Sequence, residues 1–318
     1  MDWISIAGGL VVLTIGAELL IRGSTTLARR FGVSDLLIGL TLVGFGTSTP
    51  ELVSSIQAAL VGSPGVAVGN VVGSNIANIL LILGLSALIA PFAIEPNGFR
   101  RDGIVVLLAT LAAIAASMTG EFTRIAGALF LGALASYIAY AFLTERKAPA
   151  SPAATVHAEE GASAPAAKAS PAMSAMLALG GLALLIVGAK YLVSGAISLA
   201  SDLGVSETII GLTIVAVGTS LPELVTSVMA ALRGKSALAL GNVVGSNIYN
   251  LFGILGATAL IHPVAAPASI VAFDNWVMLG ATLAMILFAT TQSRLTRLEG
   301  GALVACYAAY IGWLIVNA

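Results

Sequence analysis

Apolar residues fill ten long segments of the chain, and short stretches that carry Gly, Pro or charge separate these segments. Each segment is about 20 residues long, the length of an α-helix that crosses the hydrocarbon core of a bilayer. The pattern therefore predicts an all-α integral membrane protein with ten transmembrane helices. The predicted spans are residues 3–21, 36–61, 66–90, 103–119, 124–143, 174–200, 208–232, 237–261, 269–291 and 300–316.

Residues 144–173, between the fifth and sixth predicted spans, have a different composition. They are rich in Ala, Pro and Ser and hold most of the loop charge. This composition is typical of a solvated, flexible linker. We therefore expect two five-helix halves, residues 1–143 and residues 174–318, joined by this linker.

The two halves contain an internal repeat. Residues 31–84 align with residues 203–256 at a constant offset of 172, with 33 identities in 54 positions, which indicates a duplication. Five spans are an odd number, so the second copy must cross the membrane in the opposite direction to the first. Inverted repeats around a site at the bilayer midplane are the architecture of many secondary transporters. The sequence therefore predicts two inverted five-helix repeats.

Polar residues interrupt the second predicted span in the motif GTSTPE. Pro50 has no N–H, so it removes a backbone hydrogen bond of the helix, and its ring displaces neighbouring carbonyl groups. Irregular backbone at this depth is tolerated only where protein, a polar cavity or an ion satisfies it. The spacing i, i+3, i+4 and i+7 puts four residues on one helix face: Gly44, Thr47, Ser48 and Glu51.

The second half repeats this pattern in the motif GTSLPE, where Pro222 lies beside Thr219, Ser220 and Glu223. A second pair of motifs, GNVVGSNIAN and GNVVGSNIYN, occupies the third and eighth predicted spans. Their Ser and Asn are four residues apart, so the side-chain oxygens share a helix face. These residues are Ser74, Asn78, Ser246 and Asn250. We expect the second, third, seventh and eighth helices to be broken around a midplane ion site.

Together the motifs offer two carboxylates, two amides, four hydroxyls and freed backbone carbonyls. Such hard oxygen ligands suit Ca²⁺ or Na⁺, and the two glutamates would balance the charge of one Ca²⁺. A carboxylate inside a membrane is a functional candidate by default. An isolated Ser or Thr more often bonds its own helix backbone. The remaining motif amides are as well suited to cap broken helix ends as to touch an ion: Asn70, Asn75, Asn242 and Asn247.

Composition and charge agree with a membrane protein. The chain is 58% hydrophobic and 9% charged, against about 25% charged residues in a soluble domain. A net charge of −1 without a basic stripe argues against a nucleic-acid partner, and the expected surroundings are the lipid bilayer. The oligomeric state is left open, and a monomer is compatible with the sequence.

Basic residues predict the orientation. With ten spans, 12 of the 14 Lys and Arg fall on the linker side of the membrane, which the positive-inside rule makes cytoplasmic. Both termini are then outside. The Ala- and Gly-rich chain with short loops favours a prokaryotic plasma (inner) membrane.

The two long motifs, in the same order in both halves, resemble the α-repeats of prokaryotic-type sodium/calcium exchangers in the cation/calcium antiporter superfamily. The resemblance covers nearly the whole chain except the linker. It implies four ion sites between the second, third, seventh and eighth helices. By motif position Glu51 and Glu223 would be the central Ca²⁺ carboxylates, shared with Na⁺ in the alternate occupancy. In the family, the long first and sixth helices would slide to alternate the access to these sites.

The same resemblance implies roles for the other motif residues. Thr47 and Thr219 would contribute mainly backbone carbonyls, and Asn78 and Asn250 would complete the centre. The Na⁺ sites would use four hydroxyls and two carbonyls at the rims, from Ser48, Ser220, Ser74, Ser246, Gly44 and Ala216. Potassium-dependent exchangers carry Asp in place of Asn250, so this residue argues against K⁺ co-transport.

The expected function is electrogenic exchange of Na⁺ for Ca²⁺ by alternating access, with no enzymatic activity and no cofactor beyond the transported ions. The alternative is an H⁺-coupled exchanger of Ca²⁺ or another divalent cation, although such exchangers usually show a GNxxE-type motif. An intramembrane hydrolase would need Arg or His beside the carboxylates, and the four central spans contain none at depth. A passive channel would bind a divalent ion less tightly than two paired carboxylates do.

Overall fold

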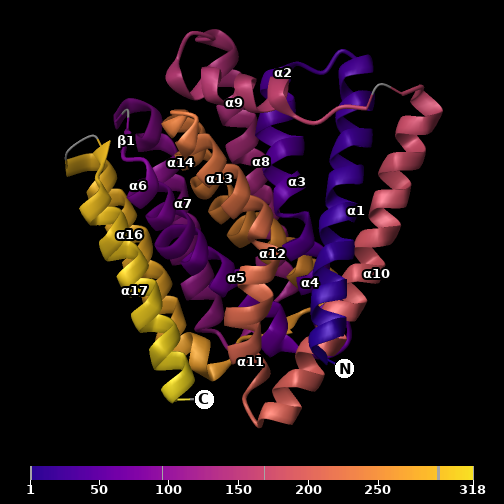
Figure 1. Cartoon of the computed structure of the whole chain (residues 1–318), viewed down its shortest axis with the longest axis vertical. Coiled ribbons are helices and arrows are strands. Elements are labelled where there is room, and N and C mark those ends of the chain that lie inside the picture. Colours follow the sequence, from indigo (N-terminus) through magenta and orange to yellow (C-terminus); the bar gives the residue numbers. More distant parts are fainter. Residues whose placement is uncertain (1, 95, 168, 292–293, 318) are drawn as a thin grey trace.

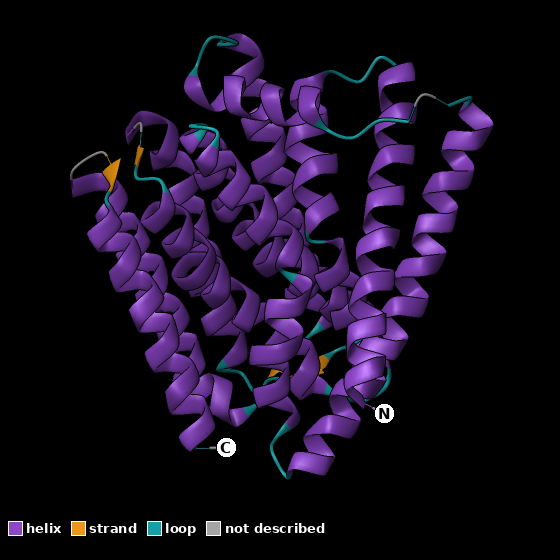
Figure 2. Ribbon diagram, viewed as in Figure 1, coloured by secondary structure: helices purple, strands orange, loops and turns teal. Residues whose placement is uncertain are grey.

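A computed structural model describes residues 2–94, 96–167, 169–291 and 294–317, and nearly all of these residues are helical (Figures 1 and 2). Helices with π-type turns are labelled η. The first half contains α1 (Asp2–Arg30), α2 (Asp35–Ile38), η1 (Gly39–Val43), α3 (Gly44–Thr47), α4 (Thr49–Leu60), α5 (Pro64–Ala77), η2 (Asn78–Leu83), α6 (Gly84–Ile89), β1 (Phe92–Ala93), α7 (Pro96–Ser117), β2 (Glu121–Phe122) and α8 (Arg124–Lys147).

The helix α9 (Pro152–Ser163) lies between the halves. The second half contains α10 (Pro171–Leu203), α11 (Glu207–Ile210), η3 (Gly211–Val215), α12 (Ala216–Thr219), α13 (Leu221–Leu232), α14 (Ser236–Ile248), η4 (Tyr249–Ile254), α15 (Leu255–Ile261), β3 (Val264–Ala265), η5 (Ile270–Asp274), α16 (Asn275–Thr291), β4 (Arg294–Leu295) and α17 (Arg297–Val316). The two-residue strands, which the sequence did not predict, pair β1 with β4 and β2 with β3.

The helices coincide with all ten predicted spans. Among the described residues, seven helices are long and apolar enough to cross a membrane, or nine if each of two bent pairs is one span. The predicted span 103–119 falls on α7, which carries Arg100, Arg101 and Asp102 near its start. Only 15 residues of this helix follow Asp102 (117 − 102 = 15), so α7 lacks a long uncharged stretch. The chain is therefore an all-helical, multi-pass membrane protein.

The two proline motifs break their helices as predicted. The helix bends by 50° between Thr47 and Thr49, and by 49° between Thr219 and Leu221. In each case the proline stands in the first turn of the following helix, α4 or α13. A proline costs little there because the first N–H groups of a helix have no partner within it.

The third and eighth helices correct the prediction, because they are not broken. Pro64–Ile89 and Ala237–Ile261 each form one continuous span. Each instead contains a π-helical turn, η2 or η4, which begins at Asn78 or Tyr249. The extra residue in such a turn redirects side chains without interrupting the helix. Glycines and small residues in the GNVVGSN motifs allow close packing rather than a break.

These two spans form the core, while α1 and α10 lie outside it. In the most apolar 18-residue stretch of each core span, 78% of the residues are buried, against 28% in the corresponding stretches of α1 and α10. The outer helices lie side by side and antiparallel (Figure 1). A Cβ on Gly9, Gly16 or Gly23 would meet α10 backbone within 3 Å, and Gly181 and Gly188 are equally tight against α1. Glycines seven residues apart thus join α1 and α10 into one rigid pair.

The linker also differs from its prediction, since it contains the helix α9. Ala154, Gly161 and Ala164 of this segment are buried. The helix lies against α2 and η1 at the end of the molecule opposite the two termini (Figure 1). We call this end of the molecule the linker side. His157 of this helix is largely buried there.

Candidate metal centre

The two helix breaks bring the predicted carboxylates together from opposite halves of the chain. The Ser48 hydroxyl donates to Glu223 Oε1 at 3.0 Å, and the Ser220 hydroxyl donates to Glu51 Oε1 at 2.9 Å. Glu51 and Glu223 are 0% and 1% exposed. Each carboxylate is therefore oriented by the serine of the other half. This reciprocal arrangement is the geometric centre of the candidate site.

One amide holds the backbone beside each carboxylate. Asn70 Nδ2 donates to the Glu51 carbonyl at 3.2 Å and to the Ser55 hydroxyl at 2.9 Å. Asn242 makes the equivalent bonds to the Glu223 carbonyl, at 3.3 Å, and to the Ser227 hydroxyl, at 2.9 Å. Of the two roles left open for these amides, the structure shows the one that supports the start of the new helix. The core spans thus position α4 and α13.

The other predicted residues of the core spans face the same centre. The Ser74 hydroxyl lies 3.4 Å from the Ala216 carbonyl oxygen, which joins α5 to α12. Asn78 Nδ2 donates to Asn247 Oδ1 at 3.0 Å. Ser246 has no hydrogen-bond partner and lies next to the Glu223 carboxylate. All of these residues except Asn247 belong to the predicted set.

Many polar atoms of this set are buried without a partner. The described residues contain thirteen buried side-chain N and O atoms that lack a hydrogen bond, and seven of them belong to the predicted site. They are Thr47 Oγ1, Glu51 Oε2, Asn78 Oδ1, Glu223 Oε2, Ser246 Oγ and both amide atoms of Asn250. An unpaired buried polar atom costs about 1–3 kcal/mol. Oxygens gathered in this way fit a bound cation.

The two halves are not equivalent at the threonines. The Thr219 hydroxyl is placed to donate to Asn70 Oδ1 at 3.1 Å or to the Val215 carbonyl at 3.0 Å. The Thr47 hydroxyl has no such partner, although each threonine lies next to the carboxylate of the other half, Thr47 beside Glu223 and Thr219 beside Glu51. A role through the backbone carbonyl therefore agrees better with Thr219 than with Thr47, whose hydroxyl is also available as a ligand.

Gly44 and Ala216 differ because of a residue that sequence reasoning missed. The ring of Tyr249 fills the space where a Cβ on Gly44 would lie. Its hydroxyl donates to the Leu40 carbonyl, and its ring packs on Phe45 with centroids 4.4 Å apart. The first repeat has Ala77 at the equivalent position, so Ala216 faces no such ring. The single difference between GNVVGSNIAN and GNVVGSNIYN was the available signal.

The charges of the site suit one divalent cation. Two carboxylates provide −2, and the remaining donors are neutral hydroxyl, amide and carbonyl oxygens, which Ca²⁺ and Na⁺ accept. The described part of the chain has no group of three His, Cys, Asp or Glu that could hold a metal. A softer metal that prefers thiolate or imidazole therefore has no matching site among these residues.

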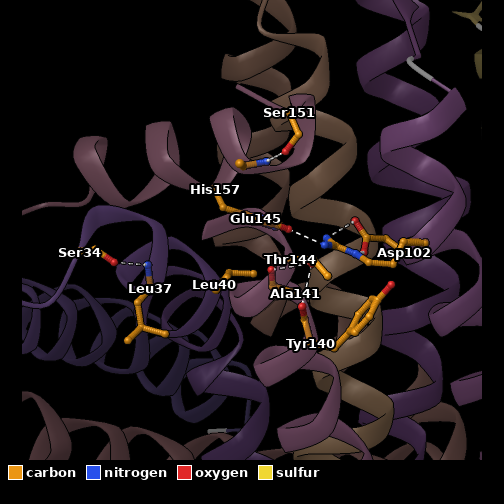
Figure 3. Close-up of polar contacts among 12 residues, drawn as sticks. Ser34, Leu37, Leu40, Asp102, Tyr140, Ala141, Thr144, Glu145, Ser151 and His157 are labelled. Atoms are coloured by element: carbon orange, nitrogen blue, oxygen red, sulfur yellow. Dashed lines mark hydrogen bonds and ion pairs between the residues drawn. The ribbon is translucent and has the colours of Figure 1, made fainter. Parts of the chain in front are cut away.

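A second polar cluster, which the sequence did not predict, joins α7, α8 and α9. Glu145 lies between His157 Nδ1, at 2.8 Å, and Arg101 Nη1, at 2.5 Å (Figure 3). Arg101 also contacts Asp102, which accepts a hydrogen bond from Tyr137. These residues are far apart in the sequence, so no local motif indicated their contact. They hold the linker helix against the transmembrane helices.

Comparison with known proteins agrees with this geometry. The model of a family described as "Sodium/calcium exchanger protein" matches residues 1–143 and 173–316. The putative antiporter CaxA of Alkalimonas amylolytica is 38% identical over 95% of this chain and 95% of its own length. The sodium/calcium exchanger MaX1 of Methanosarcina acetivorans is 34% identical, again over 95% of each chain.

A solved structure extends the similarity to the fold. The sodium-calcium exchanger NCX_Mj, soaked with Na⁺ and Ca²⁺, superposes with a TM-score of 0.63 at 33% identity. The match covers 98% of this chain and 97% of that one. Other structures of NCX_Mj, soaked with Na⁺ and Sr²⁺, match equally well.

Proposed function

The chain belongs to the sodium/calcium exchanger family of cation/calcium antiporters, and we propose that Na⁺ and Ca²⁺ are the ions that it exchanges. The observation that carries this proposal is the reciprocal pairing of Ser48 with Glu223 and of Ser220 with Glu51. It gives two carboxylates one shared, buried centre surrounded by neutral oxygens. One Ca²⁺, or a set of Na⁺ ions, can neutralise this centre, but not both together.

In this proposal Ca²⁺ binds between Glu51 and Glu223. The unpaired oxygens of Asn78 and Asn250 complete its surroundings. The Na⁺ ions share the two carboxylates and take further oxygens from the rims of the site. Those ligands are Ser48, Ser220, Ser74, Ser246, Gly44 and Ala216, while Thr47 and Thr219 contribute mainly backbone carbonyls.

Exchange then follows from competition. A buried pair of carboxylates without a cation is strongly unfavourable in a medium of low dielectric constant. The transporter therefore changes its side of access only when either Ca²⁺ or Na⁺ occupies the site. More than two Na⁺ for each Ca²⁺ makes the cycle electrogenic. Neutral Asn250, in place of an acid, makes it independent of K⁺.

We further propose ten spans in two inverted repeats, residues 1–143 and 174–318, in a prokaryotic plasma membrane. α7 supplies the tenth span, with Arg101 and Asp102 near the linker side. The repeat extends beyond the motifs: the equivalent residues Asp102 and Asp274 each accept a bond from a tyrosine. The linker is cytoplasmic and both termini are outside. The glycine-joined pair of α1 and α10 slides against the core to alternate the access.

The test is ⁴⁵Ca²⁺ uptake into proteoliposomes loaded with Na⁺ and diluted into Na⁺-free buffer at constant pH. We expect uptake that requires internal Na⁺, generates a membrane potential and is unchanged when choline replaces K⁺. Glu51→Gln and Glu223→Gln should each abolish it, because one carboxylate cannot balance Ca²⁺. Glu121→Gln, which removes an exposed carboxylate on β2, is the matched control and should transport normally.

Two other outcomes would contradict parts of this proposal. Uptake that does not depend on Na⁺ but follows an imposed pH gradient would assign the chain to H⁺-coupled exchange. Normal Na⁺-dependent uptake by the Glu51→Gln protein would contradict the proposed site.

A further inference from the structure

The linker helix α9 is fitted closely to the transmembrane helices below it. A Cβ on Gly39 of η1 would collide with the His157 carbonyl, and one on Gly161 would collide with the Asp35 carbonyl. On the other flank, a Cβ on Gly241 of α14 would lie 3.3 Å from Val156 Cγ1. Backbone therefore lies directly on backbone at Gly39 and Gly161, and the Val156 side chain lies against the backbone of Gly241. A fully solvated linker would not make such contacts.

Polar contacts attach α9 to helices that belong to different parts of the molecule. His157 bonds Glu145 of α8 (Figure 3). Arg29 of α1 donates to the carbonyls of Gly161, at 2.6 Å, and Ala162, at 3.0 Å, at the last turn of α9. A basic group there also complements the helix dipole. α9 thus connects α1, the proposed sliding helix, to α8 and α14.

Two cavities lie under α9 and reach the candidate metal centre. The larger, of about 800 Å³, lies between α1, α3, α13 and α14 and extends from Glu160 to Thr47 and Asn242, with the Glu18–Arg22 ion pair of α1 in its lining. The smaller, of about 30 Å³, extends from His157 and Glu160 to Gly44 and Ser246. Glu160 lines both cavities, and a Cβ on Gly241 would lie 3.6 Å from its carboxylate. A cation that moves between the linker side and the centre through either cavity passes this carboxylate.

We propose that α9 is the gate of the linker-side passage and that Glu160 is the carboxylate that cations meet first from that side. This inference rests on the proposed function. In the docked state, the glycine contacts and the His157–Glu145 bond hold α9 over the passage. Undocking of α9 opens the cavities to solvent and at the same time releases Arg29 of α1 from the carbonyls of Gly161 and Ala162. Opening of the gate is thereby linked to the movement of α1.

The carboxylate on the gate has a physical role in this scheme. It lies at the α9 end of cavities with mostly apolar walls, where the carboxylate, when ionised, concentrates cations. Its effect belongs to the linker side of the membrane, because Glu160 lies at the linker-side end of both cavities. Removing this charge should therefore weaken the apparent affinity for cations on the linker side alone.

The first experiment compares Glu160→Gln with Glu159→Gln in right-side-out and inside-out membrane vesicles. Glu159 is the matched control, because it is the preceding residue, is exposed and pairs only with exposed Lys235. For Glu160→Gln we expect the half-saturating Ca²⁺ concentration to rise about tenfold on the linker side. The value on the opposite side and the maximal rate should not change, which also shows that the variant is folded.

Either of two results overturns the role of Glu160. One is an unchanged half-saturating concentration on the linker side, and the other is an equal rise on both sides. If the wild-type protein does not exchange the two ions at all, the proposed function fails instead, and the two failures are thereby distinguished.

The second experiment locks the gate. Val156→Cys and Gly241→Cys, in a Cys306→Ser background, supply the two thiols, because a Cβ on Gly241 would lie 3.3 Å from Val156 Cγ1. Oxidation should reduce the rate of exchange at least about tenfold, because a gate that cannot open stops the transport cycle. Reduction of the disulfide should restore the rate. Proteins with only one of these cysteines should not respond. Undiminished exchange by a fully cross-linked protein would show that α9 need not move.

Discussion

Each carboxylate at the centre is held by a serine from the other half of the chain. The bond from Ser220 to Glu51 spans 169 residues, and the bond from Ser48 to Glu223 spans 175. A neighbouring motif therefore cannot reveal which serine serves which glutamate. The sequence identified all four residues from their spacing around the prolines, but their crossed pairing appears only when the two broken helices face each other.

The crossed pairing predicts the effect of removing one hydroxyl. A hydrogen bond to a charged group is worth about 1.5–3 kcal/mol, so Ser220→Ala should weaken Ca²⁺ binding about tenfold or more. The free Oε1 of Glu51 is then no longer held in position. The measurement is equilibrium binding of ⁴⁵Ca²⁺ to the purified protein.

Ser54→Ala is the control for this change, because Ser54 is buried one turn from Glu51 and its hydroxyl has no partner. It should leave the affinity for Ca²⁺ nearly unchanged. Equal losses in both variants would mean that the Ser220–Glu51 bond does not orient the carboxylate.

The linker helix carries two groups whose ionisation responds to pH near neutrality. Burial raises the pKa of Glu160 to about 7, with the charge of His157 opposing this shift and those of Glu145 and Asp102 adding to it. Burial lowers the pKa of His157, but the bond to Glu145 and nearby negative charges outweigh it, so this pKa is raised. The charged and titratable groups on the surrounding elements are Arg29, Asp35, Arg101, Asp102, Tyr137, Lys235 and Tyr249.

Both shifts predict that docking of α9 weakens as pH rises. The docked state binds more protons than the undocked state, so its stabilisation is full below the ordinary pKa values and is lost as pH rises through the raised ones. The contribution of Glu160 to the stability of the docked state is lost by about pH 7. The contribution of His157 is lost above pH 6.5, the ordinary pKa of a histidine. A spin label at position 158, introduced by Ala158→Cys, should therefore become more mobile between pH 6 and 8.

The control for the pH response is the double variant His157→Gln, Glu160→Gln, which keeps the helix but removes both titrating groups. Its label should show little change in mobility over the same range. A wild-type label whose mobility is constant, or falls, as pH rises would contradict the assignment.

At the scale of elements, hydrophobic runs and prolines predicted most of the fold. Helices lie over all ten predicted segments, up to nine of which are long and apolar enough to span a membrane among the described residues, and the two bends fall beside Pro50 and Pro222. The π-helical turns were missed because no residue type marks them. The helix α9 was missed because its Ala-rich, polar composition also suits a flexible linker, and contacts with residues distant in the sequence, such as Gly39, Gly241 and Glu145, hold it in place.

The glycine-joined pair of α1 and α10 gives a prediction at this scale. A Cβ on Gly16 would lie 2.8 Å from the Gly181 carbonyl and 2.8 Å from the Leu185 amide. Gly16→Ala should therefore separate the two helices and lower the free energy of unfolding by about 1–3 kcal/mol. Thermal unfolding in detergent measures the change, together with the rate of Ca²⁺ exchange.

Gly8→Ala is the matched control, because a Cβ there meets nothing within 4 Å. It should have no measurable effect on either quantity. If Gly16→Ala also changes neither the thermal unfolding nor the rate of Ca²⁺ exchange, then the pairing of α1 and α10 does not depend on this contact, and the two helices need not move as one body.

At the scale of the whole molecule, one buried centre is surrounded by two kinds of structure. The core spans and the helix breaks hold the ligands in place, while α1 and α9 line the larger cavity and α10 lies side by side with α1 (Figure 1). The proposed cycle needs the first group to stay rigid and the second to move. Competition for the two carboxylates is what couples ion binding to that movement.

Equilibrium binding of ⁴⁵Ca²⁺ to the purified protein, at constant pH and rising Na⁺, tests this competition directly. We predict that Na⁺ raises the apparent Kd for Ca²⁺ without changing the number of sites, and that the dependence on Na⁺ is steeper than first order. Glu51→Gln and Glu223→Gln should lose Ca²⁺ binding, and Glu121→Gln should keep it. Ca²⁺ that stays bound at saturating Na⁺ would contradict a shared site and with it the proposed mechanism of exchange.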